Sequence, residues 1–372
     1  MPTRSRRLIL PLLLVILLIL LSLLVYNLYT LNSAGGTAGK SAGRGESIKL
    51  GFSLGTLKEE RWLKDRDILM ARAREMGADI LVQNANNDDE DQLKQVRYLL
   101  DQDIDVLIIV PNDLQKAAIA VQLAKREGVK VISYDRLVRK SNVDLYISFD
   151  NVKVGGLMAR SLLERVPGGN YLIINGAKSD NNTGMIKEGY DAVLKPAVER
   201  GDIRILAEEW ADNWMSEYAF KVVDEVLQKG IAVDAVLAGN DGLAGGAIRA
   251  LAEHRLAGRT RVAGQDADLA GCQRIVEGSQ LMTVYKPIDK LATAAAEMAI
   301  KLARGESLNI ATTIDDGRYQ VPYYRLEPVA VDRGNIDDTI IKDGFHSRDD
   351  VYRNLTTGMA DDDWLLSAEP PS

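Results

Sequence analysis

A chain of 372 residues is too long for one small hydrophobic core and suits two medium-sized lobes. Apolar residues make up 46% and charged residues 27%, a composition typical of globular proteins that excludes a disordered chain. The formal net charge of −7 argues against nucleic acid as a partner, because contact with phosphates needs a basic surface.

Few residues in the chain are suited to metal binding or catalysis. The single cysteine, Cys272, excludes an intramolecular disulfide, and His254 and His346 stand far apart. Asp266 and Asp268 could form a catalytic carboxylate pair, but no histidine or metal cluster accompanies them, and no nucleophile elbow, P-loop or zinc-protease motif is present. We therefore expect a protein that is not an enzyme and holds neither a metal nor a cofactor.

The amino terminus has the strongest compositional signal. A basic segment, Arg4–Arg7, precedes Leu8–Val25, a run of 18 residues whose only polar member is Ser22. As a helix this run is roughly 27 Å long, close to the hydrocarbon thickness of a bilayer, and the arginines would stay inside. Residues 1–31 are therefore predicted to be an uncleaved anchor. A cleaved signal is the alternative, although Asn32–Ala34 offers only a weak cleavage site.

After a flexible linker rich in glycine, alanine and serine at 32–46, apolar runs alternate with helical patterns. This rhythm predicts right-handed βαβ units and a parallel sheet. Strands are expected at Lys49–Leu54, Asp79–Gln83, Val106–Val110, Val129–Tyr134 and Leu145–Phe149, and helices near Arg61–Met76, Asp88–Asp101 and Leu114–Glu127.

The same pattern then starts again and predicts a second lobe. Its strands are expected at Tyr171–Asn175, Arg204–Glu208, Ala235–Ala238, Arg261–Ala263 and Leu281–Tyr285, and its helices near Val152–Arg165, Asn182–Leu194, Met215–Gln228, Gly242–Glu253 and Leu269–Glu277. The fold class is thus α/β, with two similar doubly wound, Rossmann-like lobes.

The end of the chain is expected to pass between the lobes and form a multi-segment hinge. A helical pattern at Pro287–Arg304 crosses back to the first lobe, and strand-like alternation at Thr312–Val331 returns to the second. The predicted lobes are therefore 47–150 with 287–311, and 151–286 with 312–347. Residues 348–372 are polar and acidic and are expected to form a loose tail, in which Trp364 is a possible docking point.

Polar side chains gather at the predicted strand ends and first helical turns, where open α/β sheets bind ligands. Carboxylates, amides and cations together with tryptophans suit a neutral sugar, whose hydroxyls donate and accept hydrogen bonds and whose C–H faces pack on aromatic rings. The candidate ligand-binding residues are Arg61, Trp62, Lys64, Asp135, Arg136, Asn182, Trp214, Asn240, Asp266 and Lys286.

A purely structural interpretation of these residues is also open. An Asp or Asn after a strand is often the N-cap of the next helix, and Asp241 and Asp268 suit that role better than ligand binding. Lys64 could belong to a solvated helix face, and Trp210 and Trp214 could belong to the core. Only the convergence of several strand ends favours a binding site.

Several motifs together resemble the D-xylose-binding group of the type I, ribose-binding-like periplasmic binding protein family, which serves ABC sugar importers. The motifs are ERWLKDRD (Glu60–Asp67), SYDR, YISFDNVKVG (Tyr146–Gly155), DNN, NDGLAGGAI, GQDADLAG, MTVYKPI and IKDGFH (Ile341–His346), in order from about Ile48 to His346. The resemblance implies two lobes on a three-segment hinge that close on one pentose, with Trp62 and Trp214 stacking on the sugar. The sequence departs from the family pattern at Gly55–Thr56 and Ala177–Lys178.

The resemblance also implies an extracytoplasmic protein whose partners are D-xylose or a related pentose and an ABC permease. The expected anchor departs from the family, whose soluble members have a cleaved signal. Some members are instead held at the membrane and report sugar to a sensor histidine kinase, so a sugar-sensing subunit is the alternative function.

Overall fold

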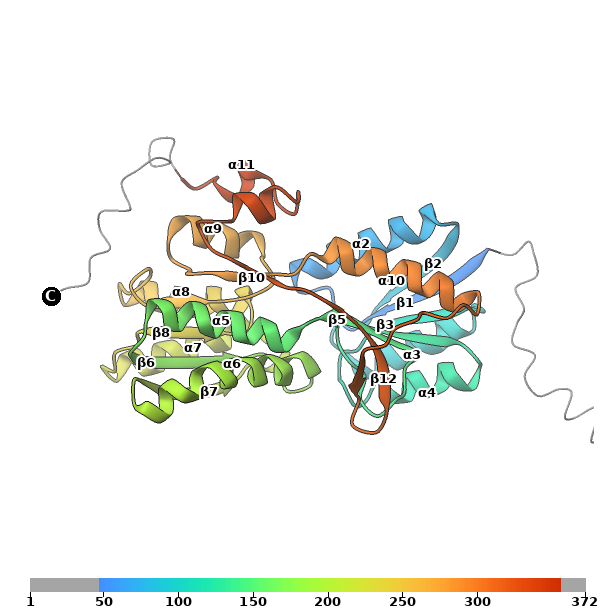
Figure 1. Cartoon of the computed structure of the whole chain (residues 1–372), viewed down its shortest axis with the longest axis horizontal. Helices are drawn as coiled ribbons and strands as arrows, with labels where there is room; N and C mark the ends of the chain where they lie inside the picture. Colours follow the sequence, from blue (N-terminus) through green and yellow to red (C-terminus); the bar gives the residue numbers. More distant parts are fainter. Residues whose placement is uncertain (1–46, 356–372) are drawn as a thin grey trace, which may run out of the picture. The chain divides into compact units, whose positions relative to one another are not determined.

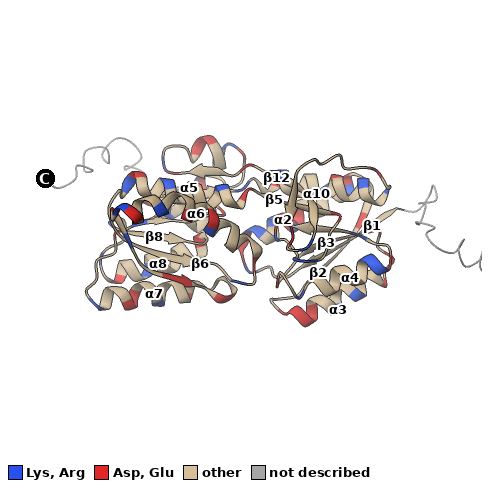
Figure 2. Cartoon of the chain, turned by 60° about the horizontal axis from the view of Figure 1, so that its bottom comes forward, with Lys and Arg blue, Asp and Glu red and all other residues tan. Residues whose placement is uncertain are grey.

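The computed structural model describes residues 47–355 (Figure 1). The expected anchor and linker, and Trp364, lie outside these residues. Within the described range, no helix combines the length and the apolarity that crossing a membrane requires. Charged residues of both signs lie interspersed over the helices of both lobes (Figure 2).

The first lobe contains a seven-stranded sheet in the order β11-β12-β5-β4-β3-β1-β2. Its neighbouring strands pair in parallel, except that β11 runs antiparallel to β12. The strands are β1 (Ile48–Leu54), β2 (Ala78–Asn84), β3 (Val106–Val110), β4 (Lys130–Tyr134), β5 (Leu145–Phe149), β11 (Thr313–Asp315) and β12 (Gln320–Leu326).

Helices cover both faces of this sheet, which explains why β3, inside the sheet, is apolar throughout. On one face Leu69 and Leu291 join Phe52 in a single buried cluster, and on the other Leu99 packs in a cluster with Leu107. The helices are α2 (Glu60–Glu75) and α10 (Ile288–Ala303) on the first face, and α3 (Asp89–Leu100) and α4 (Ala118–Arg126) on the second.

The second lobe repeats the design with a parallel sheet in the order β7-β6-β8-β9 and a two-stranded antiparallel pair, β10-β13. An isolated parallel bridge between Ala263 and Met282 links the two. The strands are β6 (Gly169–Asn175), β7 (Ile203–Trp210), β8 (Ala235–Ala238), β9 (Arg261–Ala263), β10 (Thr283–Tyr285) and β13 (Val329–Val331). The helices are α5 (Asn151–Arg165), α6 (Asn181–Arg200), α7 (Ser216–Gln228), α8 (Asp241–Glu253) and α9 (Leu269–Glu277).

The expected return of Thr312–Val331 to the second lobe is wrong for most of that segment. Strands β11 and β12 extend the first sheet, because β12 pairs in parallel with β5 and satisfies an edge that would otherwise lack partners. The ring of Tyr323 also stacks on that of Tyr146, with centroids 4.7 Å apart. Only β13 crosses to the second lobe, where it pairs with β10.

The expected loose tail is also corrected at its start. Helix α11 (Arg348–Val351) is capped by Ser347, and Val351 is buried in a cluster with Cys272 and Val276 of α9. A π-helical turn, η2 (Asp337–Ile341), precedes it and contributes Ile340 to the same cluster. The segment from 332 to 355 is therefore a structured part of the second lobe.

Helices α5 and α6 cross unusually closely at two glycines. A methyl group on Gly155 would lie 1.9 Å from the carbonyl oxygen of Ile186, and one on Gly189 would lie 1.8 Å from that of Val152. Each helix thus needs a glycine where it meets the backbone of the other. The crossing positions α6, whose first turn enters the site described below.

We predict that Gly189→Ala lowers the free energy of unfolding by about 1–3 kcal/mol, because the methyl group forces two packed backbones apart. Gly184→Ala is the matched control, since this exposed position on the same helix has nothing within 4 Å of an added methyl group. Alanine there should stabilise the protein by up to about 1 kcal/mol through helix propensity. Urea denaturation followed by circular dichroism measures both, and equal effects would contradict the crossing argument.

Candidate functional site

A pocket lies between the two lobes at the carboxyl ends of their strands, with a volume of about 330 Å³ including the part open to solvent. The walls lie close together, so little of this space is free. Its lining side chains are polar or aromatic: Glu59, Arg61, Trp62, Asp135, Arg136, Asp180, Asn182, Trp214, Asn240, Gln265, Asp266 and Lys286.

Each lobe contributes one carboxylate just beyond a strand, held on an uncommon backbone. Asp135 follows β4 with a φ of 61°, and Asp266 follows β9 with a φ of 92°. Their amides are fixed by hydrogen bonds to the carbonyl oxygens of Ile147 (2.8 Å) and Val284 (2.9 Å). Left-handed backbone at residues other than glycine is concentrated at functional sites, where the surrounding structure holds it in place.

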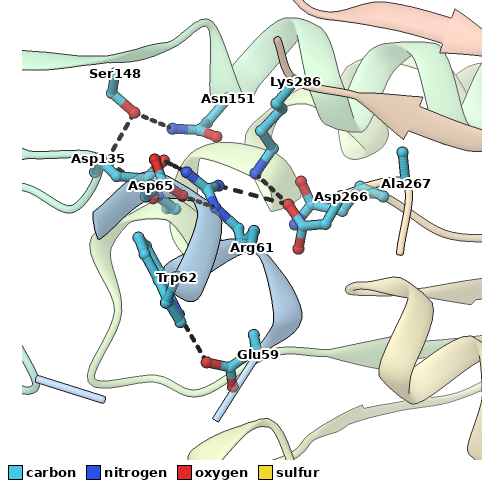
Figure 3. A network of polar contacts seen from close by, with 12 residues as sticks. Glu59, Arg61, Trp62, Asp65, Asp135, Ser148, Asn151, Asp266, Ala267 and Lys286 are labelled. Carbon is cyan, nitrogen blue, oxygen red and sulfur yellow. Dashed lines mark hydrogen bonds and ion pairs between the residues drawn. The ribbon is translucent and has the colours of Figure 1, made fainter. Parts of the chain in front are cut away.

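Arg61 connects carboxylates from both lobes (Figure 3). Its guanidinium lies 2.8 Å from Asp135 Oδ2, 3.1 Å from Asp65 Oδ2 and 3.6 Å from Asp266 Oδ1, and the side chain is 4% exposed. Burial by itself would lower the pKa of Arg61, but the three carboxylates outweigh it and raise that pKa well above its ordinary value. Asp65 is also bonded by the Tyr134 hydroxyl. Arg61 is thus a buried, permanently charged centre of the site.

Further ion pairs and hydrogen bonds surround this centre. Lys286 Nζ lies 2.9 Å from Asp266 Oδ1 within the second lobe. Across the lobes, Asn182 donates from Nδ2 to Asp135 Oδ1 (3.0 Å) and Arg136 Nε lies 2.7 Å from Asp180 Oδ2. Although burial raises the pKa of Asp135, its cationic neighbours prevail and the pKa lies below its usual value. Asp135 and Arg136 therefore bond to other partners and are not closed on each other.

The two tryptophans approach the pocket from opposite lobes. Trp62 is buried, its Nε1 donates to Glu59 Oε2 (2.7 Å), and the guanidinium carbons of Arg61 and Arg136 lie 4.4 Å and 5.2 Å from its ring centroid. Trp214 ends a 3₁₀ turn, η1 (Asp212–Trp214), with a φ of 55°. These rings supply flat apolar surface within an otherwise charged pocket.

The second-lobe wall is shaped to receive Trp214. A methyl group on Gly176 would lie 2.1 Å from the Trp214 ring, so only glycine leaves space for the indole. The indole rests against the chain just beyond β6, at the edge of the pocket.

Several buried polar atoms of the pocket have no hydrogen-bond partner within the described chain: Trp214 Nε1, Gln265 Oε1 and Asp266 Oδ1, the last of which has only ion-pair contacts. Buried polar groups are normally hydrogen-bonded. The indole N–H needs an acceptor, and Gln265 Oε1 needs a donor. The site is therefore suited to a small neutral molecule that carries both, as a sugar hydroxyl does.

The structure brings nine of the ten predicted ligand-binding residues to the pocket wall and leaves out Lys64. Lys64 lies three residues from Arg61 on α2, so the two side chains are on the same side of the helix. Its Nζ donates instead to the carbonyl oxygen of Phe345 (3.1 Å) and lies 3.1 Å from Glu60 Oε1. Lys64 is therefore bonded outside the pocket wall, unlike the other nine residues.

Sequence reasoning missed three lining residues, Glu59, Asp180 and Gln265. Glu59 directly precedes a recognised motif, and Asp180 and Gln265 lie within two others, DNN and GQD. Their position in or beside these motifs was the available signal.

The capping interpretation is confirmed for two residues of the pocket wall. Asn240 is the N-cap of α8, and its Oδ1 accepts from Leu243 N (2.8 Å). Asp180 caps α6 in the same way through Asn182 N (2.9 Å). The expected cap at Asp241 is the first helical residue instead.

We predict that Arg61→Met lowers the free energy of unfolding by about 3–5 kcal/mol, because buried carboxylates lose their counter-charge. Adding Asp65→Asn should recover part of this loss. Arg66→Met, on the outer side of the same helix, should leave stability nearly unchanged. Urea denaturation without sugar measures all three, and equal stability of the Arg61 and Arg66 variants would contradict the assigned role.

The fold and the pocket define a class, the two-lobed solute-binding proteins. A model of the periplasmic binding protein domain matches residues 50–307. The chain is 44% identical over 317 residues to the D-xylose-binding periplasmic protein of Haemophilus influenzae, covering 85% of this chain and 96% of that protein. It is 43% identical over 311 residues to the D-xylose-binding periplasmic protein of Escherichia coli, covering 83% and 94%.

Solved structures agree with the sequence comparisons. An ABC transporter solute-binding protein from Clostridium phytofermentans, with bound β-D-glucose, matches with a TM-score of 0.76 at 27% identity, covering 82% of this chain and 99% of that one. This chain belongs to the periplasmic binding protein family and has its type I fold, as the sequence motifs predicted. The family is extracytoplasmic, and these relatives are binding proteins.

Proposed function

We propose that this protein binds D-xylose, or a closely related pentose, outside the cytoplasm and delivers it to an ABC sugar importer. The observation that carries the proposal is the interlobe pocket, in which buried cations, carboxylates and two tryptophans surround polar atoms that lack partners. Among the sugars that such a pocket could accept, we propose xylose because the two relatives described above are D-xylose-binding proteins. The nine lining residues predicted from the sequence are its proposed ligand contacts.

The proposed mechanism is closure of the lobes on the sugar. Hydroxyl groups bridge Asp135 and Arg136 of the first lobe to Asn240, Asp266 and Lys286 of the second. The sugar can contact residues of both lobes only when the lobes are close together. It therefore makes more contacts in the closed arrangement and stabilises it. A membrane permease then recognises the closed surface. No chemical step is part of the proposal.

We also propose that Leu8–Val25 tethers the protein to the outer face of the membrane, on the strength of its length and apolarity. A tethered sugar sensor that signals to a histidine kinase is the second candidate function, and the same apolar run favours it.

The mass of the mature protein tests the tether, since loss of the first ~31 residues would leave a released, soluble binder. Genes for a permease and an ATPase beside this gene favour import, and a neighbouring histidine kinase favours sensing.

Isothermal titration calorimetry tests the ligand. We expect D-xylose to bind at least about tenfold more tightly than ribose, arabinose or glucose, because a misplaced hydroxyl leaves a buried polar group unpaired at a cost of about 1–3 kcal/mol. Similar affinities for all four sugars, or no binding of any of them, would contradict the xylose assignment.

Two substitutions test the site. Asp266→Ala and Arg136→Ala should each weaken xylose binding at least about tenfold, because each removes a charged hydrogen-bonding partner. Arg204→Ala, at an exposed position on β7, is the charge-matched control and should bind normally. Circular dichroism establishes that each variant is folded, and normal binding by both site variants would show that the contacts are misplaced.

A further inference from the structure

A second contact between the lobes lies beside the pocket and involves no pocket-lining side chain. Glu60 and Lys64 on α2 of the first lobe meet Phe345 and His346 of the segment that follows η2 in the second lobe. We call these four residues the clasp. They include the lysine that sequence reasoning had placed on the sugar.

His346 is held from both sides of its ring. Its Nε2 lies 2.7 Å from the carbonyl oxygen of Ala267, and its Nδ1 lies 3.3 Å from Lys64 Nζ. A carbonyl oxygen only accepts and an ammonium group only donates, so Nε2 must carry the hydrogen and Nδ1 must be free of one. The contacts therefore require a neutral imidazole in one tautomer.

The first-lobe side of the clasp is equally well bonded. Lys64 Nζ donates to the carbonyl oxygen of Phe345 (3.1 Å), lies 4.1 Å from the centroid of that ring and pairs with Glu60 Oε1 at 3.1 Å. Glu60 Oε2 accepts from the amide of Leu269 (3.0 Å), at the start of α9. Both side chains of α2 thus reach across to backbone groups of the second lobe.

Each end of the clasp adjoins a pocket residue. Ala267, whose carbonyl His346 binds, directly follows Asp266, and both have left-handed backbone, with φ of 55° and 92°. Lys64 is less than one helical turn from Arg61 on α2. The clasp therefore fixes the two backbone segments that carry opposing charges of the pocket.

From these contacts we propose that Lys64 and His346 are positioning residues that latch the two lobes together and slow ligand release without touching the ligand. The inference rests on the proposed function, since it assigns a role in the binding cycle of the same pocket. Removing the clasp deletes no lining side chain, so its effect should fall on the dissociation rate, koff, more than on the association rate.

The clasp should also respond to acid. Protonation of His346 removes the acceptor at Nδ1 and sets two cations 3.3 Å apart. Burial and the Lys64 charge lower the pKa of His346, although its bond to Ala267 and the carboxylates of Glu60 and Asp350 oppose this. A group whose pKa is lowered in the latched form supports that form above the ordinary imidazole value of about 6.5 and loses this support as the pH falls.

Other acids near the clasp have raised pKa values. Burial raises the pKa of Asp241 to about 7 and that of Asp268 well above its ordinary value. Asp268 adjoins Ala267 and faces Glu60, and Cys272 of α9 lies nearby. A pH profile of the wild type alone therefore does not isolate His346, and a variant must do so.

Stopped-flow kinetics with D-xylose on the full chain tests the latch. Lys64→Met should raise koff about tenfold at pH 7.5, because charge-assisted hydrogen bonds across the lobes are lost, while association changes less than about threefold. Arg74→Met, an exposed cation on the same helix, is the matched control and should release xylose at the wild-type rate.

His346→Gln tests whether the protonation of His346 causes the response to acid. The glutamine amide can donate to Ala267 as the imidazole does, yet it stays neutral at every pH. We expect wild-type koff to rise several-fold between pH 7.5 and 5.5, and koff of His346→Gln to vary much less over that range. His346→Ala should release xylose faster than His346→Gln at pH 7.5.

The outcomes are distinguishable from failure of the proposed function. If the wild type binds no xylose, the function itself is wrong. If it binds xylose but Lys64→Met and His346→Ala release it at the wild-type rate while remaining folded, the latch is overturned. An unchanged acid response in His346→Gln would overturn the assignment of that response to His346.

Discussion

The site depends on the burial of one permanent positive charge among carboxylates. Arg61 is almost fully buried, and Asp65, Asp135 and Asp266 surround it from its own helix, its own lobe and the opposite lobe. Taking such charges out of water is unfavourable unless they are paired and hydrogen-bonded. The first lobe thus supplies a buried guanidinium, and both lobes supply carboxylates that neutralise it. A neutral polar ligand can enter this site without changing its net charge.

The rest of the architecture places these charges. Two parallel sheets point the carboxyl ends of their strands at one pocket, helix N-caps hold Asn182 and Asn240 there, and left-handed residues turn Asp135 and Asp266 inward. Buried apolar clusters on the faces of each sheet support this arrangement. The pocket is thus a consequence of topology, and its chemistry depends on which polar residues stand at a few strand ends.

Much of this was predictable from sequence. Runs such as Val106–Val110 and Ala235–Ala238 have the structure that their apolar pattern predicted, because buried parallel strands leave little ambiguity. The pairing of β12 was not predictable, since alternation identifies a strand but not the sheet that it joins. Lys64 lies outside the pocket wall because its ammonium group bonds Glu60 and the carbonyl oxygen of Phe345, and a motif match does not show such partners. Its true partner, His346, is 282 residues away in sequence, and no local pattern connects them.

The pairing of β12 with β5 has a mechanical consequence. Two of the crossings between the lobes leave the first sheet from neighbouring strands, and the amide of Asp150 bonds the carbonyl oxygen of Leu326 (2.9 Å) where they depart. Joined strands cannot slide past each other without breaking these hydrogen bonds, so the pairing favours a rotation of the lobes over a sliding motion in the proposed closure. In the closure proposed above, Arg61 approaches Asp266 as Lys64 approaches His346. A sugar in the pocket and a proton on His346 would then act on the same rotation from opposite directions.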